Sequence, residues 1–220
     1  MIIAGAILLA GVLIAGAILL RGKAPAAPTP ADGPDLGSIN IDVQKDEHIF
    51  GNADADIVIV EYSDTECPFC KRFHDTMHEV VNAYGDKVAW VYRHYPIPQL
   101  HQRAFNESLA LECAWEQGGN DTFWKYTDEV YARTESNDSL EPAELPKIAA
   151  DLGLNVSTFT TCLADGKYSD KVDLHMKSGS EAGVNGTPSS FIIKKGKVVD
   201  VIAGAEPFES VKVKLDKIVK

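Results

Sequence analysis

With 220 residues, the chain is long enough for one large hydrophobic core but short for two independent domains. Its formal net charge is -11 at pH 7, and 45% of its residues are hydrophobic. This balance argues against a nucleic-acid-binding protein, because contacts to phosphates require clustered Lys and Arg. We therefore expect an acidic globular domain that binds no nucleic acid.

The N-terminus is uniformly apolar. Residues 2–20 carry no charged side chain, and a helix of that length spans about 28 Å, enough to cross a bilayer. We predict a transmembrane anchor or uncleaved signal over residues 1–21, with cleavage as the alternative, and a Pro/Ala-rich linker over residues 22–38. Arg21 and Lys23 follow the span and by themselves favour a cytoplasmic body, so the charges leave the orientation open.

Strand and helix signals alternate after the linker. Residues 39–43 alternate weakly, as in an edge strand, and residues 57–62, IVIVEY, form an apolar run typical of a buried strand. Helical spacing follows from Cys67 to Gly85, and residues 87–92 predict a second strand. A strand, helix, strand order predicts a crossover between parallel strands. The apolar positions of the helix are Phe69, Phe73, Met77, Val80 and Val81.

The rest of the chain is mostly helical in pattern. Residues from about 99 to 183 predict an all-helical insertion, with helices on both sides of the Gly118–Gly119 pair. Residues 191–193 and 198–202 then predict a hairpin joined by KKGK, and residues 207–220 a final helix.

The stretch DTECPFC places Cys67 and Cys70 where the first strand passes into the helix. A thiol at a helix N-terminus has a lowered pKa, because unpaired N–H groups and the helix dipole favour the thiolate. Pro68 suits the first helical turn. Cys70, one turn later, would be more shielded and able to attack a mixed disulfide formed at Cys67.

Zinc binding is the competing interpretation of C-x-x-C, and it lacks further ligands. Cys113 and Cys162 form no second knuckle, since both lie far apart in helical segments. His74 and His78 have the i, i+4 spacing of a metalloprotease helix, but Asp75 stands where that motif carries glutamate. We predict no metal site.

A second motif, GVNGTPSSFII, places Thr187 and Pro188 at the start of a strand. Proline cannot donate to a sheet ladder, so it suits a first strand position, and a cis bond would turn the preceding backbone outward. Because Cys67 follows one strand and Pro188 precedes another, the two residues can meet in space.

Taken in order, IVEYSDTECPFCKRFH, RHYPIP, CAWEQGGNDTFWKYTDEVY and GVNGTP resemble the DsbA-like branch of the thioredoxin-fold thiol-disulfide oxidoreductases. The resemblance covers residues from about 40 to 220. It implies an α/β thioredoxin fold over residues 39–220 that is interrupted by the helical subdomain. The transmembrane helix predicted from the apolar run precedes this domain.

The resemblance also implies roles for individual residues. Cys67 is the nucleophile and Cys70 the resolving cysteine of a redox disulfide, and Pro188 is the cis-proline that faces them. Glu61, in IVEY, corresponds to an acidic residue beneath the site that assists proton transfer; an ordinary strand-end carboxylate is the alternative. The residues expected to contact substrate are Thr187, Pro188, Pro68 and Phe69.

One departure concerns the direction of electron flow. Strongly oxidising members carry histidine where this chain has Phe69, which supplies no positive charge or ring N–H to the thiolate. We expect a dithiol oxidase with a less oxidising disulfide. A disulfide isomerase or reductase of the same fold is the alternative, because isomerase-type relatives also carry threonine before the proline, as this chain does at Thr187. A non-enzymatic binding module is a third interpretation.

The family implies no dissociable cofactor. Its substrates are reduced or misfolded proteins, and its disulfide is regenerated by a membrane partner of the DsbB or vitamin K epoxide reductase type. The domain is then expected outside the cytoplasm, in the periplasm or at the cell exterior, tethered to the cell membrane. In that compartment Cys113 and Cys162 would form a structural disulfide, with two buried free thiols as the alternative.

Overall fold

The computed structural model describes residues 36–44 and 46–219. The predicted membrane anchor, residues 1–21, and most of the predicted linker lie outside these residues. In the described part of the chain, no helix has both the length and the apolar character needed to cross a membrane. The linker prediction meets the described residues only at its end, where Leu36–Ser38 forms a short 3-10 helix, η1.

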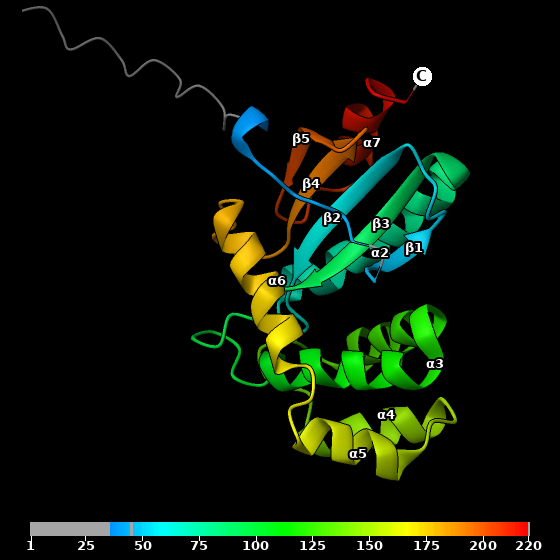
Figure 1. Ribbon diagram of the computed structural model, residues 1–220, viewed down its shortest axis with the longest axis vertical. Helices are drawn as coiled ribbons and strands as arrows, with labels where there is room; N and C mark the ends of the chain where they lie inside the picture. The colour runs from blue at the N-terminus through cyan, green and yellow to red at the C-terminus, as the bar shows by residue number, and fades with distance from the viewer. Residues whose placement is uncertain (1–35, 45, 220) are drawn as a thin grey trace, which may run out of the picture. The chain divides into compact units, whose positions relative to one another are not determined.

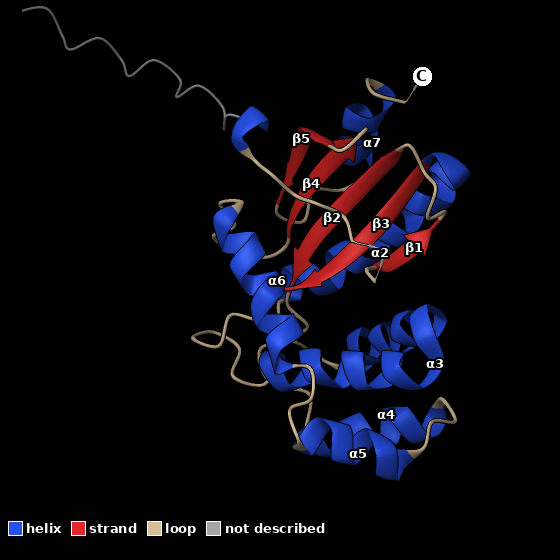
Figure 2. Cartoon of the chain, viewed as in Figure 1, coloured by secondary structure: helices blue, strands red, loops and turns tan. Residues whose placement is uncertain are grey.

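A five-stranded sheet lies at the centre of the fold, with the strand order β1-β3-β2-β4-β5 (Figures 1 and 2). The strands β2 (Ile57–Ser63) and β3 (Val88–His94) pair in parallel, which confirms the predicted crossover. The strands β1 (His48–Gly51), β4 (Ser189–Lys194) and β5 (Lys197–Ala203) add antiparallel pairs. The central strand β2 is apolar throughout most of its length because both of its faces are covered.

The predicted edge strand at residues 39–43 is wrong. This segment forms no strand, and the edge of the sheet is β1 instead. Ile41 is only 5% exposed and packs with Ile39 and Val43 on the sheet face that carries Val60 and Val91. The weak alternation therefore reflects side chains of an extended segment that pack on the sheet without backbone pairing.

Helix α2 (Pro68–Tyr84) covers the opposite face of the sheet. Phe73 and Met77 are fully buried there, and Gly85 ends the helix with a φ of 55°. Phe69 differs from the prediction, because its side chain is 55% exposed and Cys70 takes the buried position of that turn. The short 3-10 helix η2 (Gly85–Lys87) then leads into β3.

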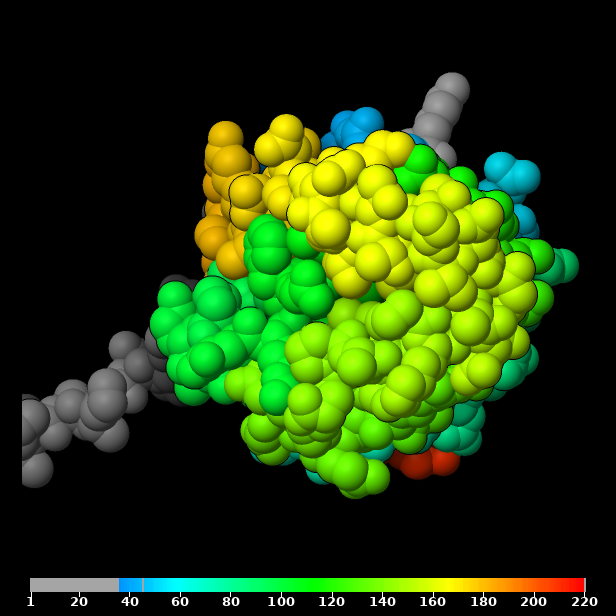
Figure 3. Space-filling model, turned by 90° about the horizontal axis from the view of Figure 1, so that it is seen from below, coloured from blue at the N-terminus to red at the C-terminus, as the bar shows by residue number. Residues whose placement is uncertain are grey.

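An all-helical insertion separates β3 from β4, as predicted. Its helices are α3 (Ala104–Arg133), α4 (Leu145–Asp151), α5 (Val156–Ala164) and α6 (Ser169–Glu181), with a short 3-10 helix, η3 (Pro142–Glu144), before α4. The two helices predicted around the glycine pair form one interrupted helix, α3, which Gly119 breaks with a φ of 69°. The arrowheads of β2 and β3 point toward this insertion in Figure 1, and its green and yellow residues make up most of the face shown in Figure 3.

A disulfide joins two helices of the insertion. Cys113 on α3 and Cys162 on α5 have an S–S distance of 2.00 Å and a Cα–Cα distance of 5.9 Å. Their side chains are 1% and 6% exposed. Of the two states that the sequence left open, the structure has the bonded pair.

The chain ends in the predicted hairpin, β4 and β5, and in helix α7 (Phe208–Asp216). Val211 and Leu215 of α7 are fully buried in the same core as the apolar side of α2. The hydroxyl of Tyr84, the last residue of α2, donates to Asp216 Oδ1 at 2.7 Å. Helix α7 therefore supports α2 on its face of the sheet.

Candidate active site

The two cysteines of the C-P-F-C motif lie at the start of α2, directly after the loop that follows β2. Cys67 is the N-cap residue of the helix, with extended backbone angles, and Cys70 lies within the first turn. Both thiols are free. Cys67 is 5% exposed and Cys70 is 0% exposed, whereas Pro68 and Phe69 between them are exposed. A reacting sulfur atom from outside therefore reaches Cys67 first.

Thr187 and Pro188 lie opposite Cys67, although 120 residues separate Thr187 from Cys67 along the chain. Cys67 Sγ lies 3.4 Å from the backbone oxygen of Thr187, to which it donates when protonated, and the Thr187–Pro188 peptide bond is cis. Pro188 directly precedes β4, which pairs with β2 from the contact Tyr62 to Ser189 onward. Because β2 and β4 are antiparallel neighbours, the sheet brings the end of one to the beginning of the other.

The surroundings of Cys67 favour its thiolate. The Cys70 thiol contributes most, as a hydrogen-bond donor, and the backbone N–H groups of Cys70 and Phe69 add to it. Although partial burial opposes them, together they lower the pKa of Cys67 from 9.0 to about 6. Burial and the neighbouring Cys67 raise the pKa of Cys70 well above its ordinary value. At pH 7 the reduced pair therefore carries one negative charge, on Cys67.

Alkylation of the reduced protein is expected to show this lowered pKa. The alkylation rate of Cys67 should rise with pH and have its midpoint near pH 6, since only the thiolate reacts. About nine-tenths of Cys67 should be thiolate at pH 7. Mass spectrometry after brief exposure to iodoacetamide measures the rate at each pH. In a Cys70→Ala variant the midpoint should move upward, because the strongest donor is gone. A wild-type midpoint above about pH 8, as in an ordinary thiol, would contradict this pKa.

Glu61 lies on the face of β2 that α2 covers. Its side chain is 1% exposed, and Oε2 has no hydrogen-bond partner among the described residues. Burial raises the pKa of Glu61 to about 8, and the charge of a Cys67 thiolate acts in the same direction. Glu61 in turn contributes to the raised pKa of Cys70. A carboxyl group that is mostly protonated at pH 7 thus lies within electrostatic reach of both thiols.

The raised pKa of Glu61 predicts a pH-dependent stability. The carboxyl favours its protonated form in the folded state, so its contribution is complete below pH 4.5 and is lost as the pH rises through about 8. From this group alone, the free energy of unfolding should fall by up to about 1.4 kcal/mol per pH unit over that window. A Glu61→Gln variant should lack this fall. Urea unfolding of both reduced proteins across the window is the measurement, and equal slopes would rule out a raised pKa.

A buried group of hydroxyls next to the thiols was not predicted. Ser63 Oγ and Tyr92 OH lie 3.1 Å and 3.3 Å from Tyr131 OH. Burial raises the pKa of both tyrosines well above the ordinary value, and the charges of Cys70 and Glu61 act in the same direction. Both hydroxyls therefore stay neutral. Ser63 and Tyr92 could have been suspected as strand-end residues beside the motif. Tyr131 of α3 ends the stretch CAWEQGGNDTFWKYTDEVY, but the family resemblance of that stretch gave the tyrosine no role.

Two carboxylates of the quoted stretch DTECPFC shape the loop before Cys67. Asp64 accepts hydrogen bonds from the backbone N–H of Ile97 at 2.8 Å and from His101 at 2.9 Å. Glu66, which is fully buried, accepts from the hydroxyl of Thr134 at 3.0 Å. The loop is thereby tied to the segments that flank α3, and its carboxylates are structural partners that the sequence did not reveal.

The family model described as thioredoxin matches residues 43–216. The chain belongs to the thioredoxin family. The match begins before β1 and ends with the last residue of α7, so the thioredoxin-family domain includes the helical insertion as well as the sheet.

Solved DsbA structures share this fold. DsbA2 of Pseudomonas aeruginosa has a TM-score of 0.70 and 25% identity, with coverage of 81% of this chain and 97% of that chain. Alpha-DsbA1 of Wolbachia pipientis has a TM-score of 0.68 and 21% identity, covering 80% and 92%. Oxidised BdbD of Bacillus subtilis has a TM-score of 0.68 and 19% identity, covering 79% and 92%. This thioredoxin-family chain thus has the fold of the DsbA-like thiol-disulfide oxidoreductases, which confirms the resemblance.

Curated relatives of this thioredoxin-family chain include Na(+)/H(+) antiporters. The Na(+)/H(+) antiporter NhaA 1 of Mycolicibacterium gilvum is 32% identical over 154 residues, and NhaA of Herminiimonas arsenicoxydans is 32% identical over 146 residues. The matched segments make up 69% and 66% of this chain but 24% and 22% of the antiporters. The chain therefore spans about a quarter of the length of these relatives, and the similarity concerns one part of each antiporter.

Proposed function

We propose that this thioredoxin-family chain is an extracytoplasmic protein-disulfide oxidoreductase, and that it acts as a dithiol oxidase on unfolded secreted proteins. The observation that carries the proposal is the contrast between the two thiols. The pKa of Cys67, at the helix N-terminus, is lowered to about 6, while that of the buried Cys70 is raised. A stabilised thiolate favours the reduced state of the pair, and this makes the corresponding disulfide a better oxidant.

The reaction starts from the closed Cys67–Cys70 disulfide. A substrate thiolate attacks Cys67 Sγ, the more exposed sulfur, and forms a mixed disulfide while Cys70 leaves with the electron pair of the broken bond. A second substrate thiolate then attacks the substrate sulfur of the mixed disulfide and releases the Cys67 thiolate. The substrate has lost two electrons to form one disulfide, and the pair has gained them as a dithiol.

Glu61 is suited to supply the proton that this step requires. Cys70 has a raised pKa, so it takes up a proton as it leaves. Glu61 holds a proton at neutral pH because burial raises its pKa to about 8. Transfer from Glu61 to Cys70 would avoid leaving a thiolate charge on a side chain with no exposure to solvent.

The substrate would bind along Thr187 and Pro188. The backbone there faces Cys67 at the start of β4, where an extended peptide can pair as a short strand. Pro68 and Phe69 add exposed apolar surface beside Cys67. Unfolded proteins expose apolar side chains, so a non-specific apolar contact at this position suits many substrates.

Regeneration needs an electron acceptor that the chain itself does not hold. We assign this role to a membrane quinone-linked partner of the DsbB or vitamin K epoxide reductase type, near which the predicted anchor at residues 1–21 would keep the domain. A structural disulfide in the insertion supports a location outside the reducing cytoplasm.

Incubation of the oxidised full chain with a reduced, unfolded secreted protein tests the proposal. Each equivalent of chain should introduce one disulfide into the substrate, and the Cys67 and Cys70 thiols should appear at the same rate. If the substrate gains no disulfide and the reduced chain instead cleaves disulfides of the oxidised substrate, the chain is a reductase. If neither exchange occurs, the non-enzymatic binding module is the better assignment.

A further inference from the structure

Three potential metal ligands converge beside α2, one turn beyond Cys70. His74 and His78 lie on α2, and Asp128 lies on α3. His74 Nε2 is 2.7 Å from Asp128 Oδ1, and His78 Nε2 is 3.1 Å from each of these two atoms. Around a cation with bonds of about 2.0 to 2.2 Å, neighbouring ligand atoms lie about 2.8 to 3.6 Å apart. The three atoms are spaced nearly as they would be around one bound ion.

Hydrogen bonds alone cannot satisfy these three contacts. An imidazole Nε2 presents either one proton or one lone pair, and an ionised carboxylate only accepts. If both rings donate to Asp128, two N–H groups face each other at 3.1 Å. If one ring instead keeps a lone pair on Nε2, that lone pair faces a carboxylate oxygen, and the two acceptors repel each other. A cation among the three atoms would instead accept a lone pair from each of them.

The site is reachable from solvent. The side chain of His74 is 5% exposed, that of His78 is 23% exposed and that of Asp128 is 48% exposed. They line an open cavity of about 440 Å³. An ion held there would keep positions for water or for a further ligand. The other lining residues are Lys71, Asp75, Tyr131 and Ala132.

One of the ligands is already held in place for a cation. The ring of His74 packs against those of Trp90 and Tyr131, at centroid distances of 5.2 Å and 4.6 Å, which fixes its orientation.

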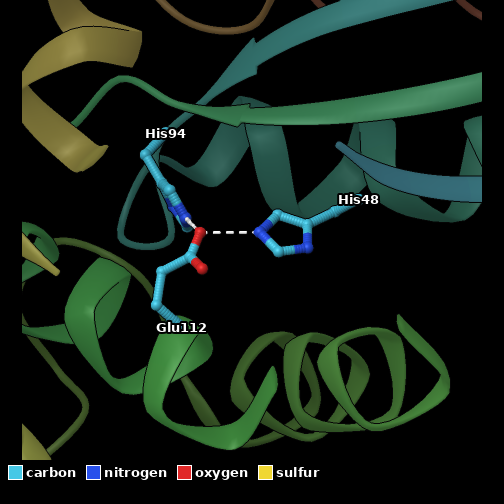
Figure 4. Close-up of side chains that lie close together, drawn as sticks. All are labelled: His48, His94 and Glu112. Atoms are coloured by element: carbon cyan, nitrogen blue, oxygen red, sulfur yellow. Dashed lines mark hydrogen bonds and ion pairs between the residues drawn. The ribbon is translucent and has the colours of Figure 1, made fainter. Parts of the chain in front are cut away.

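A second histidine cluster shows the contrasting case. His48 Nε2 and His94 Nε2 lie 2.6 Å and 2.9 Å from the same oxygen of Glu112, which Figure 4 shows between the two rings. One carboxylate oxygen can accept from both. Lys171 Nζ donates to the other oxygen at 3.0 Å, so a cation already balances this charge. His48, His94 and Glu112 are 0% exposed, and Lys171 Nζ also lies 3.1 Å from His48 Nε2. In contrast to the cluster on α2, this one is closed to solvent and already has an ammonium group beside it.

We propose that His74, His78 and Asp128 bind one divalent transition-metal ion, with Zn²⁺ as the representative. Two imidazole nitrogens and one carboxylate oxygen suit Zn²⁺ and its neighbours better than Ca²⁺ or Mg²⁺. The sequence offered the two histidines without a third ligand, because Asp128 lies 50 residues after His78. The bound ion would link α2, which carries the cysteine pair, to α3 of the insertion. This site does not depend on the proposed oxidase function.

Calorimetric titration of Zn²⁺ into the full chain tests the site. The Cys67–Cys70 disulfide is closed first, so that these thiolates cannot bind the metal. Wild type should bind one equivalent of Zn²⁺. His78→Ala and Asp128→Asn should each weaken Zn²⁺ binding by at least about tenfold, because the loss of a residue that only hydrogen-bonds to a metal ligand already has an effect of that size. The side chains of His78 and Asp128 are partly exposed, so these substitutions should leave the packing of the hydrophobic core unchanged. Asp121→Asn, at an exposed position of α3, is the matched control and should bind as wild type does.

Thermal unfolding provides a second readout. Saturating Zn²⁺ should raise the Tm of wild type and of Asp121→Asn, because the ion binds the folded state, and should raise it less in the two ligand variants. No binding by wild type at millimolar Zn²⁺ would overturn the proposal. Equal affinity in wild type, His78→Ala and Asp128→Asn would also overturn it, as would binding that only a Glu112→Gln substitution removes.

Discussion

Replacing Cys67 with serine is expected to lower the rate of disulfide exchange with protein substrates by more than about a thousandfold, because a hydroxyl cannot form the mixed disulfide. Cys70 should not substitute for it, since its side chain has no exposure and its pKa is raised. The rate of disulfide formation in a reduced, unfolded protein measures the loss.

The matched variant removes the other thiol of the pair. Cys70→Ala should retain attack by Cys67 on substrate disulfides but not the resolving step, so covalent complexes should accumulate and disappear on addition of dithiothreitol. Non-reducing electrophoresis and peptide mapping identify the bonded cysteine. The assignment of the nucleophile is wrong if Cys67→Ser keeps more than about a tenth of the exchange rate, or if the substrates are bonded at Cys70 in the wild-type chain.

Removal of the disulfide in the insertion should have the second large effect. Because Cys113 and Cys162 are separated by 49 positions in the sequence, the chain-entropy estimate is about 4 kcal/mol of folding free energy. The Cys113→Ala/Cys162→Ala variant should therefore unfold at lower urea concentration, with an m-value at least as large as that of wild type because the unfolded chain is less compact without the bond. Urea unfolding of both proteins with the Cys67–Cys70 pair in the same redox state measures the difference. A loss below about 1 kcal/mol would mean that the insertion does not depend on this bond.

Local patterns in the sequence were sufficient to predict the elements around the cysteine pair. The apolar run of β2, the helical spacing and terminal Gly85 of α2, and the parallel β3 agree with the structure, because burial and helix ends leave local signals. The same approach gave a wrong prediction, an edge strand, for residues 39–43. Its alternation has the period of a strand, but the segment packs through its side chains while β1 makes the backbone pairs.

The parts of the site that the sequence did not predict are tertiary contacts. Phe69 was placed on the apolar side of α2 by its spacing, yet the chain entering the helix leaves it exposed and buries Cys70. Tyr131 and Asp128 reach the site only because α3 lies beside α2, and although both lie in the stretch CAWEQGGNDTFWKYTDEVY, nothing in it singled out either side chain. Thr187 and Pro188 were predicted because a proline at the start of a strand is a local signal and the family resemblance supplied its partner.

Phe69 is also the residue on which the direction of electron flow depends. It offers no ring N–H to the Cys67 thiolate, so the lowered pKa rests mainly on Cys70 and on the first-turn backbone amides. A pKa of about 6 is intermediate between those of thioredoxin, about 7, and DsbA, about 3.5. The chain is therefore expected to be an oxidant of moderate strength.

The reduction potential of the Cys67/Cys70 pair tests this account most directly. The full chain is equilibrated in glutathione buffers of graded ratio, and the fraction of the reduced pair is measured after acid quenching and alkylation. We expect a value between about -180 and -120 mV, the range from protein disulfide isomerase to DsbA. A value near the potential of thioredoxin, about -270 mV, would contradict the assignment as an oxidase and identify a reductase.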